Sequence, residues 1–259
     1  MSELLKRVIV SLIFIPGLLW ILYHGGIVLI GLFFVLASLG FYEYKKMMAS
    51  INIHIGFHWL VVNALCYNAF VWLRGYDIVI VWALFMIILV SAMLLWNREK
   101  SVLPMLSTLF GIIYLGILPA LIVRIGIDFY VQKILLALIL MIWIVDSVAY
   151  FIGMKYGKHR NVIEISPRKS IEGFIAGGLV PFLIVAAYYF IGCYPISMKN
   201  MLLVAFAAGV VGQIGDLCES MLKRFCTVKD SSDFIPGHGG VLDRMDSALL
   251  AGSFLYCAL

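Results

Sequence analysis

Long apolar runs dominate the chain, and short polar segments separate them. The runs cover about residues 8–23, 26–42, 56–73, 78–96, 104–123, 132–152, 171–191, 201–219 and 243–259. A helix needs roughly 20 mostly apolar residues to cross a bilayer, and these runs lack the alternation of a membrane barrel. We therefore expect an all-α, polytopic integral membrane protein with about nine transmembrane helices.

The composition supports a membrane protein and leaves no room for a separate soluble domain. The 259 residues are 64% hydrophobic and only 13% charged, whereas soluble domains carry about 25% charged residues. The net charge of +5 does not indicate nucleic-acid binding, because basic residues in such a protein first of all set its orientation. The five cysteines form no CxxC pair, so neither a disulfide framework nor a zinc site is expected.

The basic residues predict the orientation in the membrane. With the N-terminus in the cytoplasm, fifteen of the nineteen Lys and Arg residues fall on the cytoplasmic side, which is the usual bias. The remaining four are Arg74, Arg124, Lys133 and Lys199. This orientation places both long polar loops, after the sixth and eighth runs, in the cytoplasm and the C-terminus outside.

One polar stretch, Gly215 to Asp246, stands out from this apolar background. It holds six of the fourteen acidic residues and four of the nineteen basic ones. Asp216, Glu219, Ser220 and Lys223 recur at intervals of three and four, so they share one face of a helix. Such a concentration of charge indicates a site that handles a metal ion and phosphate at a membrane surface.

Carboxylates from two helices are expected to meet in this stretch. Asp216 precedes the polar loop, while Asp243 and Asp246 open the last apolar run. Mg²⁺ takes one or two carboxylates and completes its shell with water and substrate phosphate. The alternative, ion pairing of these acids with Arg224 and Arg244, stays open from the sequence alone.

A second polar group lies around the sixth run. Asp146 sits deep in that run, where a lone carboxylate requires a partner, a polar cavity or a metal ion. The basic loop that follows ends in Ser166-Pro167-Arg168-Lys169-Ser170. Ser166 and Pro167 suit a helix start, where free N–H groups favour phosphate. Structural hydrogen bonding of Asp146 and solvation of the basic loop remain the alternatives.

The first five runs show no chemistry that we can interpret. Tyr42-Glu43-Tyr44-Lys45-Lys46 closes the second run, and we interpret it as an interfacial anchor of aromatic and charged side chains. We accordingly expect residues 1–130 to form a scaffold facing lipid or a second copy, and residues 131–259 to carry the catalytic site, within one membrane domain.

The polar stretch resembles the signature of phosphatidate cytidylyltransferases (CDP-diacylglycerol synthases). The matching positions are Ser220, Lys223-Arg224, Lys229-Asp230, Ser232, Ile235-Pro236, His238-Gly239-Gly240, Asp243-Arg244 and Asp246. Earlier positions also fit, namely Asp146, Ala149-Tyr150, Gly153, Gly157, Ser166-Pro167, Lys169, Glu172-Gly173 and Gly215-Asp216. Ser170 stands where threonine is more usual, and the hydroxyl is kept.

The resemblance implies a Mg²⁺-dependent enzyme that makes CDP-diacylglycerol and pyrophosphate from CTP and phosphatidic acid; a second cation is left open. It implies a homodimer in a bacterial inner membrane, in contact with lipid. The expected catalytic residues are Asp216, Lys223, Arg224, Asp243, Arg244 and Asp246, of which Asp216, Asp243 and Asp246 would bind metal. The expected substrate-binding residues are Asp146, Ser166, Lys169, Ser170, Glu172, Ser220, Lys229, His238, Gly239 and Gly240.

Two other functions fit parts of the sequence. Another membrane transferase or kinase that uses a nucleotide or a lipid phosphate, such as a polyprenol kinase, would need similar charges. A cation-coupled transporter would also carry intramembrane acids, but it predicts them near mid-membrane on a path with two exits. Here the acids cluster near cytoplasmic ends, which favours the enzyme.

Overall fold

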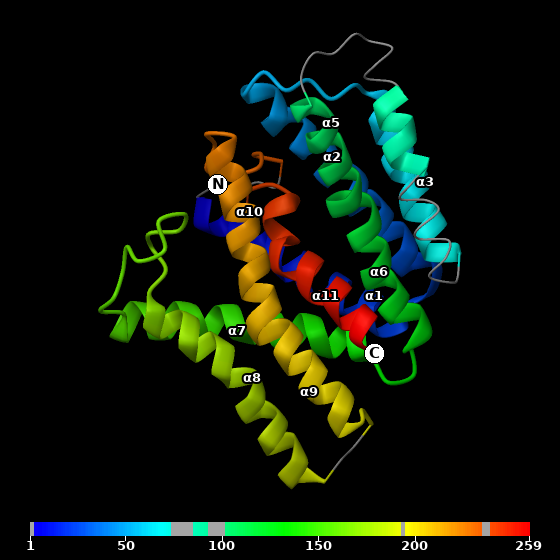
Figure 1. The fold of residues 1–259 in the computed structure, drawn as a ribbon. Helices are drawn as coiled ribbons and strands as arrows, with labels where there is room; N and C mark the ends of the chain where they lie inside the picture. Colours follow the sequence, from blue (N-terminus) through cyan, green and yellow to red (C-terminus); the bar gives the residue numbers. More distant parts are fainter. Residues whose placement is uncertain (1–2, 74–84, 93–101, 193–194, 235–238) are drawn as a thin grey trace.

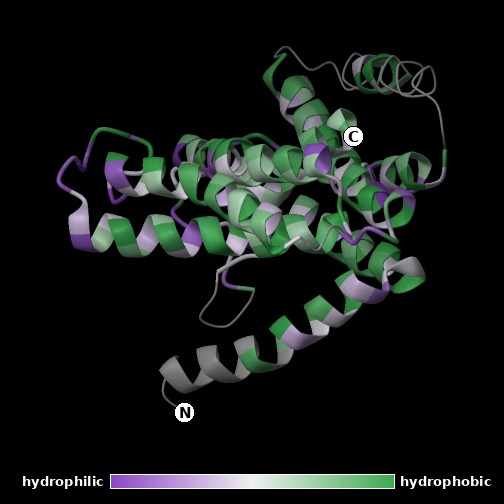
Figure 2. Ribbon diagram, turned by 90° about the horizontal axis from the view of Figure 1, so that it is seen from below, coloured by the Kyte–Doolittle hydropathy of each residue, from purple (hydrophilic) through white to green (hydrophobic). Residues whose placement is uncertain are grey.

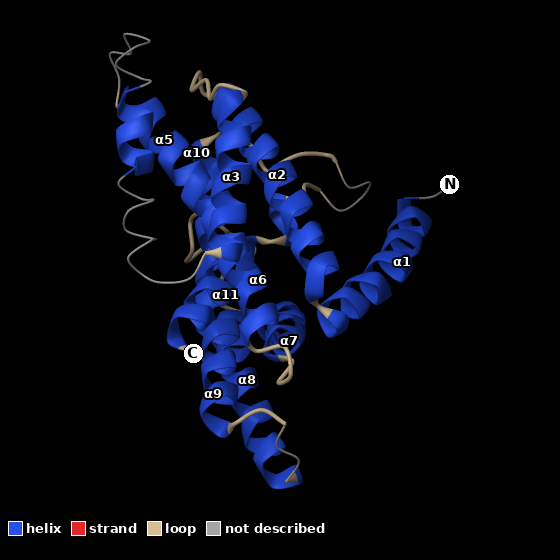
Figure 3. Ribbon diagram, turned by 90° about the vertical axis from the view of Figure 1, so that its right-hand side faces the viewer, coloured by secondary structure: helices blue, strands red, loops and turns tan. Residues whose placement is uncertain are grey.

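The structure is a computed structural model that describes residues 3–73, 85–92, 102–192, 195–234 and 239–259. Helices make up the regular structure of these residues, and no β-strand occurs among them, as Figure 3 shows. The expected all-α class is confirmed. The helices are α1 (Glu3–His24), α2 (Gly26–Ser50), α3 (His58–Trp72), α5 (Leu103–Ile112), α6 (Leu118–Asp128), α7 (Ile134–Tyr156), α8 (Ile171–Ile191), α9 (Met198–Phe206), α10 (Gln213–Phe225) and α11 (Asp246–Ala258).

Short π- and 3₁₀-helical segments join some of these helices. The π-helical turn η1 (Ile113–Ile117) links α5 to α6, and η2 (Ala207–Gly212) links α9 to α10. Both linked units run without a break, as Leu103–Asp128 and Met198–Phe225. A 3₁₀ turn, η3 (Leu242–Arg244), precedes α11.

Among the described residues, five helices are long and apolar enough to cross a membrane. They are Gly26–Ser50, Leu103–Asp128, Ile134–Tyr156, Ile171–Ile191 and Met198–Phe225. The expected count of nine is not confirmed: α3 and α11 have only 15 and 13 residues. Of the expected run 78–96, residues 85–92 are helical and the rest lies outside the described residues.

Figure 1 shows how the helices are arranged. The unit α9–η2–α10 lies beside α11, and α7 crosses these helices and packs along α8. In Figure 3, α1 extends away from the body and meets α2 at the short turn between them. Helices from both parts of the chain, α2 and α6 with α10 and α11, therefore form one body.

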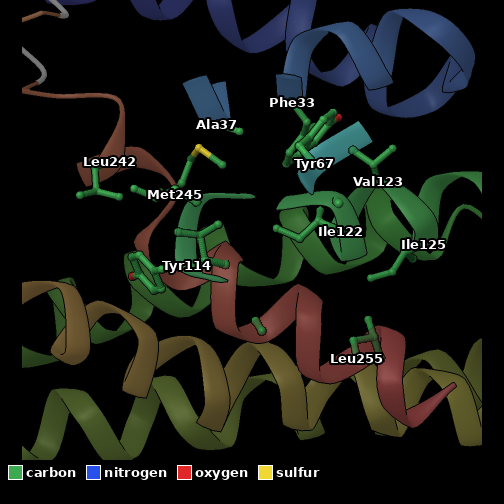
Figure 4. Packing of buried hydrophobic residues seen from close by; sticks show 14 of the residues in the cluster. Phe33, Ala37, Tyr67, Tyr114, Ile122, Val123, Ile125, Leu242, Met245 and Leu255 are labelled. Carbon is green, nitrogen blue, oxygen red and sulfur yellow. The ribbon is translucent and has the colours of Figure 1, made fainter. Parts of the chain in front are cut away.

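The core lies where α2, α3, α6 and α11 meet. Tyr67, Ile122 and Leu255 are fully buried there, and Figure 4 shows their side chains pointing between the helices. Tyr114 and Met245 are buried near the start of α11. This packing fixes the beginning of α11, where the acidic residues of the polar stretch lie.

A buried ion pair stabilises the opposite end of α11. The Arg124 guanidinium lies 2.7 Å from Asp128 Oδ2 and donates to Tyr256 Oη at 3.2 Å. Arg124 is buried, and a buried charge is retained when it is paired and hydrogen-bonded. Arg124 therefore lies inside the helical body. The prediction of orientation had placed it in an external loop.

The start of α8 differs from the prediction. Ser166 and Pro167 lie in a turn, and the helix begins at Ile171 with Ser170 as its N-cap. The physical reason is that the Ser170 hydroxyl accepts from the Gly173 N–H at 3.1 Å, which satisfies one of the free donors of a helix start. A Cβ at Gly173 would lie 2.5 Å from the Ala149 carbonyl oxygen, so this glycine lets α7 and α8 pack closely.

Polar residues gather at one end of the α7–α8 pair. In Figure 2 the hydrophilic colour concentrates there, at the loop that joins the two helices, while the bodies of the helices are mainly hydrophobic. This loop, residues 157–170, carries four basic residues, Lys158, Arg160, Arg168 and Lys169, of which Lys169 was expected to bind substrate.

Candidate active site

Two cavities meet at the carboxylates of Asp146 and Asp216. The first has a volume of about 600 Å³ and the second about 430 Å³, and both residues line both cavities. Asp146 comes from α7 and Asp216 from α10. The two cavities therefore share one acidic boundary. Away from this boundary, cationic side chains line part of the first cavity, and large apolar side chains line most of the second.

The first cavity, which we call the basic cavity, lies between α7, α8 and α10. Its lining residues are Asp146, Ala149, Tyr150, Gly153, Met154, Arg160, Arg168, Lys169, Ser170, Gly173, Phe174, Gln213 and Asp216. Three of them are cationic and come from the loop between α7 and α8. Arg160 is held in place because its guanidinium donates to the Gly153 carbonyl at 2.9 Å.

The second cavity, which we call the apolar cavity, lies between α1, α2, α7 and the start of α11. Its lining residues are Phe14, Leu18, Leu22, Phe33, Leu36, Ile139, Ile142, Trp143, Asp146, Asp216, Val241, Asp243, Arg244, Met245, Asp246, Ser247 and Ala248. Its charged residues gather at the boundary with the basic cavity and at the start of α11. The rest of its wall is apolar and comes largely from the first two helices and α7.

Close packing of α10 against α11 brings Asp216 and Asp246 to the same boundary. A Cβ at Gly215 would lie 2.7 Å from the Asp246 carbonyl oxygen, so the two helices approach at a distance that only glycine permits. Asp216 forms an ion pair with Lys169 and accepts from the Ser220 hydroxyl at 3.4 Å. The predicted residues Asp216, Ser220, Lys169 and Asp246 are thus brought together.

The acids at the boundary act on one another. Asp146 lies close enough to Asp216, Lys169 and Arg244 to interact with them electrostatically. Asp246 interacts in the same way with Asp146 and Asp216. Three carboxylates from three helices therefore concentrate negative charge in one place, and basic residues on either side partly offset it.

Lys223 links two further acids behind this boundary. Its ammonium group forms an ion pair with Glu219 and lies 2.6 Å from Asp243 Oδ1. Ion pairing of the acids was an alternative that the sequence left open, and it is observed with lysines. Asp216 pairs with Lys169, and Glu219 and Asp243 pair with Lys223.

Asp243 is held on both of its oxygens. Oδ2 accepts from the backbone N–H groups of Ser231 and Gly240, at 3.0 and 2.8 Å, and from the Ser231 hydroxyl at 2.9 Å. Burial by itself raises the pKa of Asp243, but the hydrogen bonds from Lys223, Gly240 and Ser231 outweigh it and lower the pKa below its ordinary value. Asp243 therefore stays ionised and anchors the loop before α11.

Several predicted site residues lie away from the two cavities. Arg224 is exposed and donates to the Val228 carbonyl at 3.0 Å, and Lys229 is exposed on the following turn. Glu172 accepts from the backbone and ring nitrogens of His159, at 3.1 and 2.6 Å, and so stabilises the basic loop. Ser166 itself lines neither cavity, although Arg168 and Lys169 of the same turn line the basic cavity.

The predicted glycine turn is described in part. His238 lies outside the described residues. Gly239 and Gly240 are next to Asp243: Gly239 has a φ of +79°, and the Gly240 N–H donates to Asp243. Contact of these glycines with a substrate stays a prediction.

Three residues of the site did not emerge from the sequence. Arg160 lay among basic residues interpreted only as orientation signals, and Gln213 is one polar residue in an apolar run. Glu43 was placed at the interface, yet it is only 3% exposed and is hydrogen-bonded to the segment before α11. Tyr44 is also buried, so the interfacial anchor is wrong for these two residues, whereas Lys46 lies over the Tyr42 ring as an anchor would.

The residues present can take part in binding a cation with a substrate. Within the described residues, no three His, Cys, Asp or Glu side chains converge as a complete metal site. Mg²⁺ does not need one, because it commonly binds one or two carboxylates and completes its shell with water and substrate phosphate. Asp216 and Asp246, which repel each other at the boundary, fit that requirement. Both Asp243 oxygens already accept hydrogen bonds, so its role as a ligand stays a prediction.

Comparison with known proteins identifies the family. The family profile described as "Cytidylyltransferase family" matches residues 5–259, nearly the whole chain. The chain belongs to the cytidylyltransferase family. Because the match includes the helices before residue 130, it covers the parts of the cytidylyltransferase fold where the sequence shows no recognisable motif.

Individual relatives of this cytidylyltransferase carry a more specific name. A phosphatidate cytidylyltransferase of Staphylococcus aureus (strain COL) is 34% identical over 255 residues, which cover 94% of this chain and 92% of that protein. The one from Staphylococcus epidermidis (strain ATCC 12228 / FDA PCI 1200) is 32% identical over 253 residues, with the same coverage. The one from Bacillus subtilis (strain 168) is 45% identical over 118 residues, 46% of this chain and 44% of that protein. The resemblance inferred from the motifs is confirmed.

Proposed function

We propose that this protein is a phosphatidate cytidylyltransferase, which converts CTP and phosphatidic acid to CDP-diacylglycerol and pyrophosphate. The observation that carries the proposal is the pair of cavities with different walls that share Asp146 and Asp216. A reaction between a water-soluble nucleotide and a membrane lipid requires such an arrangement. One substrate must reach the reaction centre from water and the other from the bilayer.

The basic cavity suits the nucleotide. Arg160, Arg168 and Lys169 line it, and a triphosphate is recognised by several cationic donors that neutralise its charge. Lys169 forms an ion pair with Asp216, so it sits at the boundary where the reacting phosphate must lie. The volume of the basic cavity, about 600 Å³, falls within the range of about 300–1,000 Å³ typical of small-molecule sites.

The apolar cavity suits phosphatidic acid. Phe14, Leu18 and Leu22 of α1 line one side, and Arg244 is at the polar end with Asp246. A lipid needs apolar surface for the glycerol and the first acyl carbons, and a cation for its phosphate. This assignment separates the two substrates between the two cavities, a distinction that the sequence does not provide.

The reaction then requires alignment and charge neutralisation. A phosphate oxygen of phosphatidic acid forms a bond to the α-phosphorus of CTP, and the bond from that phosphorus to the bridging oxygen of the β-phosphate breaks. Pyrophosphate leaves with the bonding electron pair. Because the lipid phosphate is itself the nucleophile, the protein supplies no covalent group. Lys169 and the arginines position and neutralise the phosphates, which is the main contribution of proteins to such transfers.

We propose Mg²⁺ as the cofactor, bound by Asp216 and Asp246 together with substrate phosphate; Asp146 is the third carboxylate at the boundary. When bound, the ion neutralises phosphate charge. The concentration of carboxylates from α7, α10 and α11 supports this proposal. A second cation and metal binding by Asp243 are finer points of the same proposal.

We further propose a homodimer in a bacterial inner membrane, with the N-terminus and the two cavities on the cytoplasmic side and the C-terminus outside. The distribution of Lys and Arg supports this orientation. CTP is made in the cytosol, which requires the basic cavity to open there.

Product analysis tests the proposed function. The purified protein in detergent, supplied with CTP, phosphatidic acid and Mg²⁺, is expected to give CDP-diacylglycerol and pyrophosphate in equal amounts, which ³¹P NMR resolves. Omitting phosphatidic acid is the control. In a parallel assay with a polyprenol in place of phosphatidic acid, formation of phosphorylated polyprenol and CDP would identify a kinase. Ion flux in vesicles without any product would identify a transporter, and either result would contradict the proposal.

A further inference from the structure

Glu43 is a buried carboxylate far in sequence from the polar stretch. It lies on α2 and is 3% exposed. Oε1 accepts from the Ser232 hydroxyl and from the Val241 N–H, the latter at 2.9 Å. Oε2 accepts from the Ser231 hydroxyl at 3.1 Å and from the Leu242 N–H at 2.9 Å. A buried carboxylate with donors on both oxygens is a strong point of attachment, because such charge-assisted bonds are about twice as strong as neutral ones.

These donors come from both sides of one loop, residues 231–234 and 239–242, which we call the anchored loop. Glu43 therefore joins the beginning of this loop to its end, where η3 starts. The Ser231 hydroxyl also lies 2.9 Å from Asp243 Oδ2. A hydroxyl has one proton, which Ser231 shares between the Glu43 and Asp243 carboxylates, and Asp243 in turn accepts from Lys223.

The anchored loop fits so closely around Glu43 that glycine is needed at position 240. A Cβ at Gly240 would lie 2.7 and 2.9 Å from the two Glu43 oxygens and 1.9 Å from the Ser231 hydroxyl. Those distances are shorter than any real Cβ contact. The glycine of the polar turn is therefore explained by contact with α2, independently of any substrate.

We propose that Glu43 is a positioning residue for the reaction: it fixes the anchored loop and thereby places Arg244 and Asp246 at the boundary of the two cavities. The inference rests on the proposed function for the meaning of that boundary. Leu242, which donates to Glu43, is two residues before Arg244 and four before Asp246, so a shift of the loop is transmitted directly to both.

The position of Glu43 predicts an effect on one substrate. Arg244 and Asp246 line the apolar cavity but not the basic cavity, whose cations come from the loop between α7 and α8. Displacing the anchored loop should therefore lower kcat and raise KM for phosphatidic acid, while KM for CTP stays the same. A general loss of folding would reduce the amount of active enzyme without this separation.

The test is Glu43→Gln, which keeps the shape of the side chain. Serine hydroxyls can turn to accept from the new amide, but the N–H of Val241 or Leu242 cannot, so one buried donor faces another donor. We expect kcat/KM for phosphatidic acid to fall by about tenfold or more, with KM for CTP within about twofold, which is less than about 0.5 kcal/mol. Glu43→Asp keeps both acceptor oxygens and should recover part of the activity.

Asp128→Asn is the matched control, because it weakens the buried pair at the other end of α11. It should lower the melting temperature without changing either KM. Equal changes of both KM values in Glu43→Gln, or no change in kcat and KM for phosphatidic acid, would overturn the proposal.

Hydrogen exchange at the Val241 and Leu242 amides provides a readout independent of activity. Both amides should exchange faster in Glu43→Gln than in Asp128→Asn, and equal exchange would also overturn the proposal. An inactive wild-type protein whose Val241 and Leu242 amides still respond to Glu43→Gln would count against the proposed function and leave the attachment by Glu43 in place.

Discussion

Lys169 shows at the scale of single residues how the site divides its work. Its ammonium group pairs with Asp216 and lines the basic cavity, so under the proposed function it connects the nucleotide to the acidic boundary. Lys223, by contrast, pairs with Glu219 and Asp243 behind the boundary and is largely buried. Two lysines of the same polar pattern thus lie at different places, Lys169 at the basic cavity and Lys223 beside the anchored loop.

Lys169→Ala is expected to raise KM for CTP by about ten- to a hundredfold, because it removes a charge-assisted contact to phosphate. KM for phosphatidic acid should change little. Lys158→Ala, on the same loop but exposed and outside the cavity lining, serves as the control. Steady-state kinetics with each substrate varied in turn make the comparison. An unchanged KM for CTP would remove Lys169 from the nucleotide site.

Asp243 gives a prediction about pH. Its pKa is lowered in the folded protein, so its contribution to stability is present above the ordinary value of 3.8 and is lost as the pH falls through the folded value. Wild type should melt at a higher temperature than Asp243→Asn at neutral pH. The melting temperatures of the two proteins should converge as the pH falls below 3.8.

Melting in detergent over this pH range checks the prediction. The exposed Asp233 of the same loop provides the control, because Asp233→Asn should follow wild type at every pH. A constant difference between wild type and Asp243→Asn down to the lowest pH would contradict the account.

At the scale of elements, α1 and α2 belong to the site. Phe14, Leu18 and Leu22 form a wall of the apolar cavity, and α2 carries Glu43. α3, α5 and α6 bury side chains in the core, and a scaffold role for the helices before residue 130 stays a prediction. Under the two proposals, α1 and α2 would contribute both to binding of the lipid substrate and to the position of the anchored loop.

Leu18→Trp tests the wall formed by α1. The larger side chain should partly fill the apolar cavity and raise KM for phosphatidic acid by about tenfold, leaving KM for CTP unchanged. Ile15→Trp is the control, since Ile15 is 40% exposed on the same helix and does not line the cavity. Equal effects of the two substitutions would show that α1 does not contact the lipid substrate.

The residues found from the sequence and those missed differ in their surroundings. The sequence indicated four residues at the boundary, because a charge in or beside an apolar run needs a partner, a polar cavity or a metal ion. They are Asp146, Lys169, Asp216 and Asp246. Glu43 was missed because tyrosines and lysines surround it, a composition typical of an interface, and its partners Ser231 and Leu242 are 188 and 199 residues away. Such separations leave no periodic signal. The one available hint was the position of Glu43, which lies between Tyr42 and Tyr44 and precedes Lys45 and Lys46.

The length of the helices was also predictable only in part. The run 171–191 coincides with α8, and 201–219 lies within Met198–Phe225. The runs 104–123 and 201–219 each continue across η1 or η2 without a break, but the sequence could not show that these turns are π-helical, because they are as apolar as their neighbours. It also could not distinguish the short α11, which is largely buried against α6 and α10, from a helix that spans the bilayer.

At the scale of the whole molecule, one body brings together a basic cavity, an apolar cavity and an acidic boundary. The helices before residue 130 and those after it both contribute, and the family match over residues 5–259 agrees with that. The central claim is that the α-phosphate of CTP is transferred to a lipid phosphate at this boundary.

The most direct measurement follows a radioactive label from two positions of CTP. With phosphatidic acid and Mg²⁺ present, label from [α-³²P]CTP should enter the lipid extract, and label from [γ-³²P]CTP should remain in water as pyrophosphate. Transfer of the γ label to lipid, or no lipid label from either nucleotide, would contradict the account.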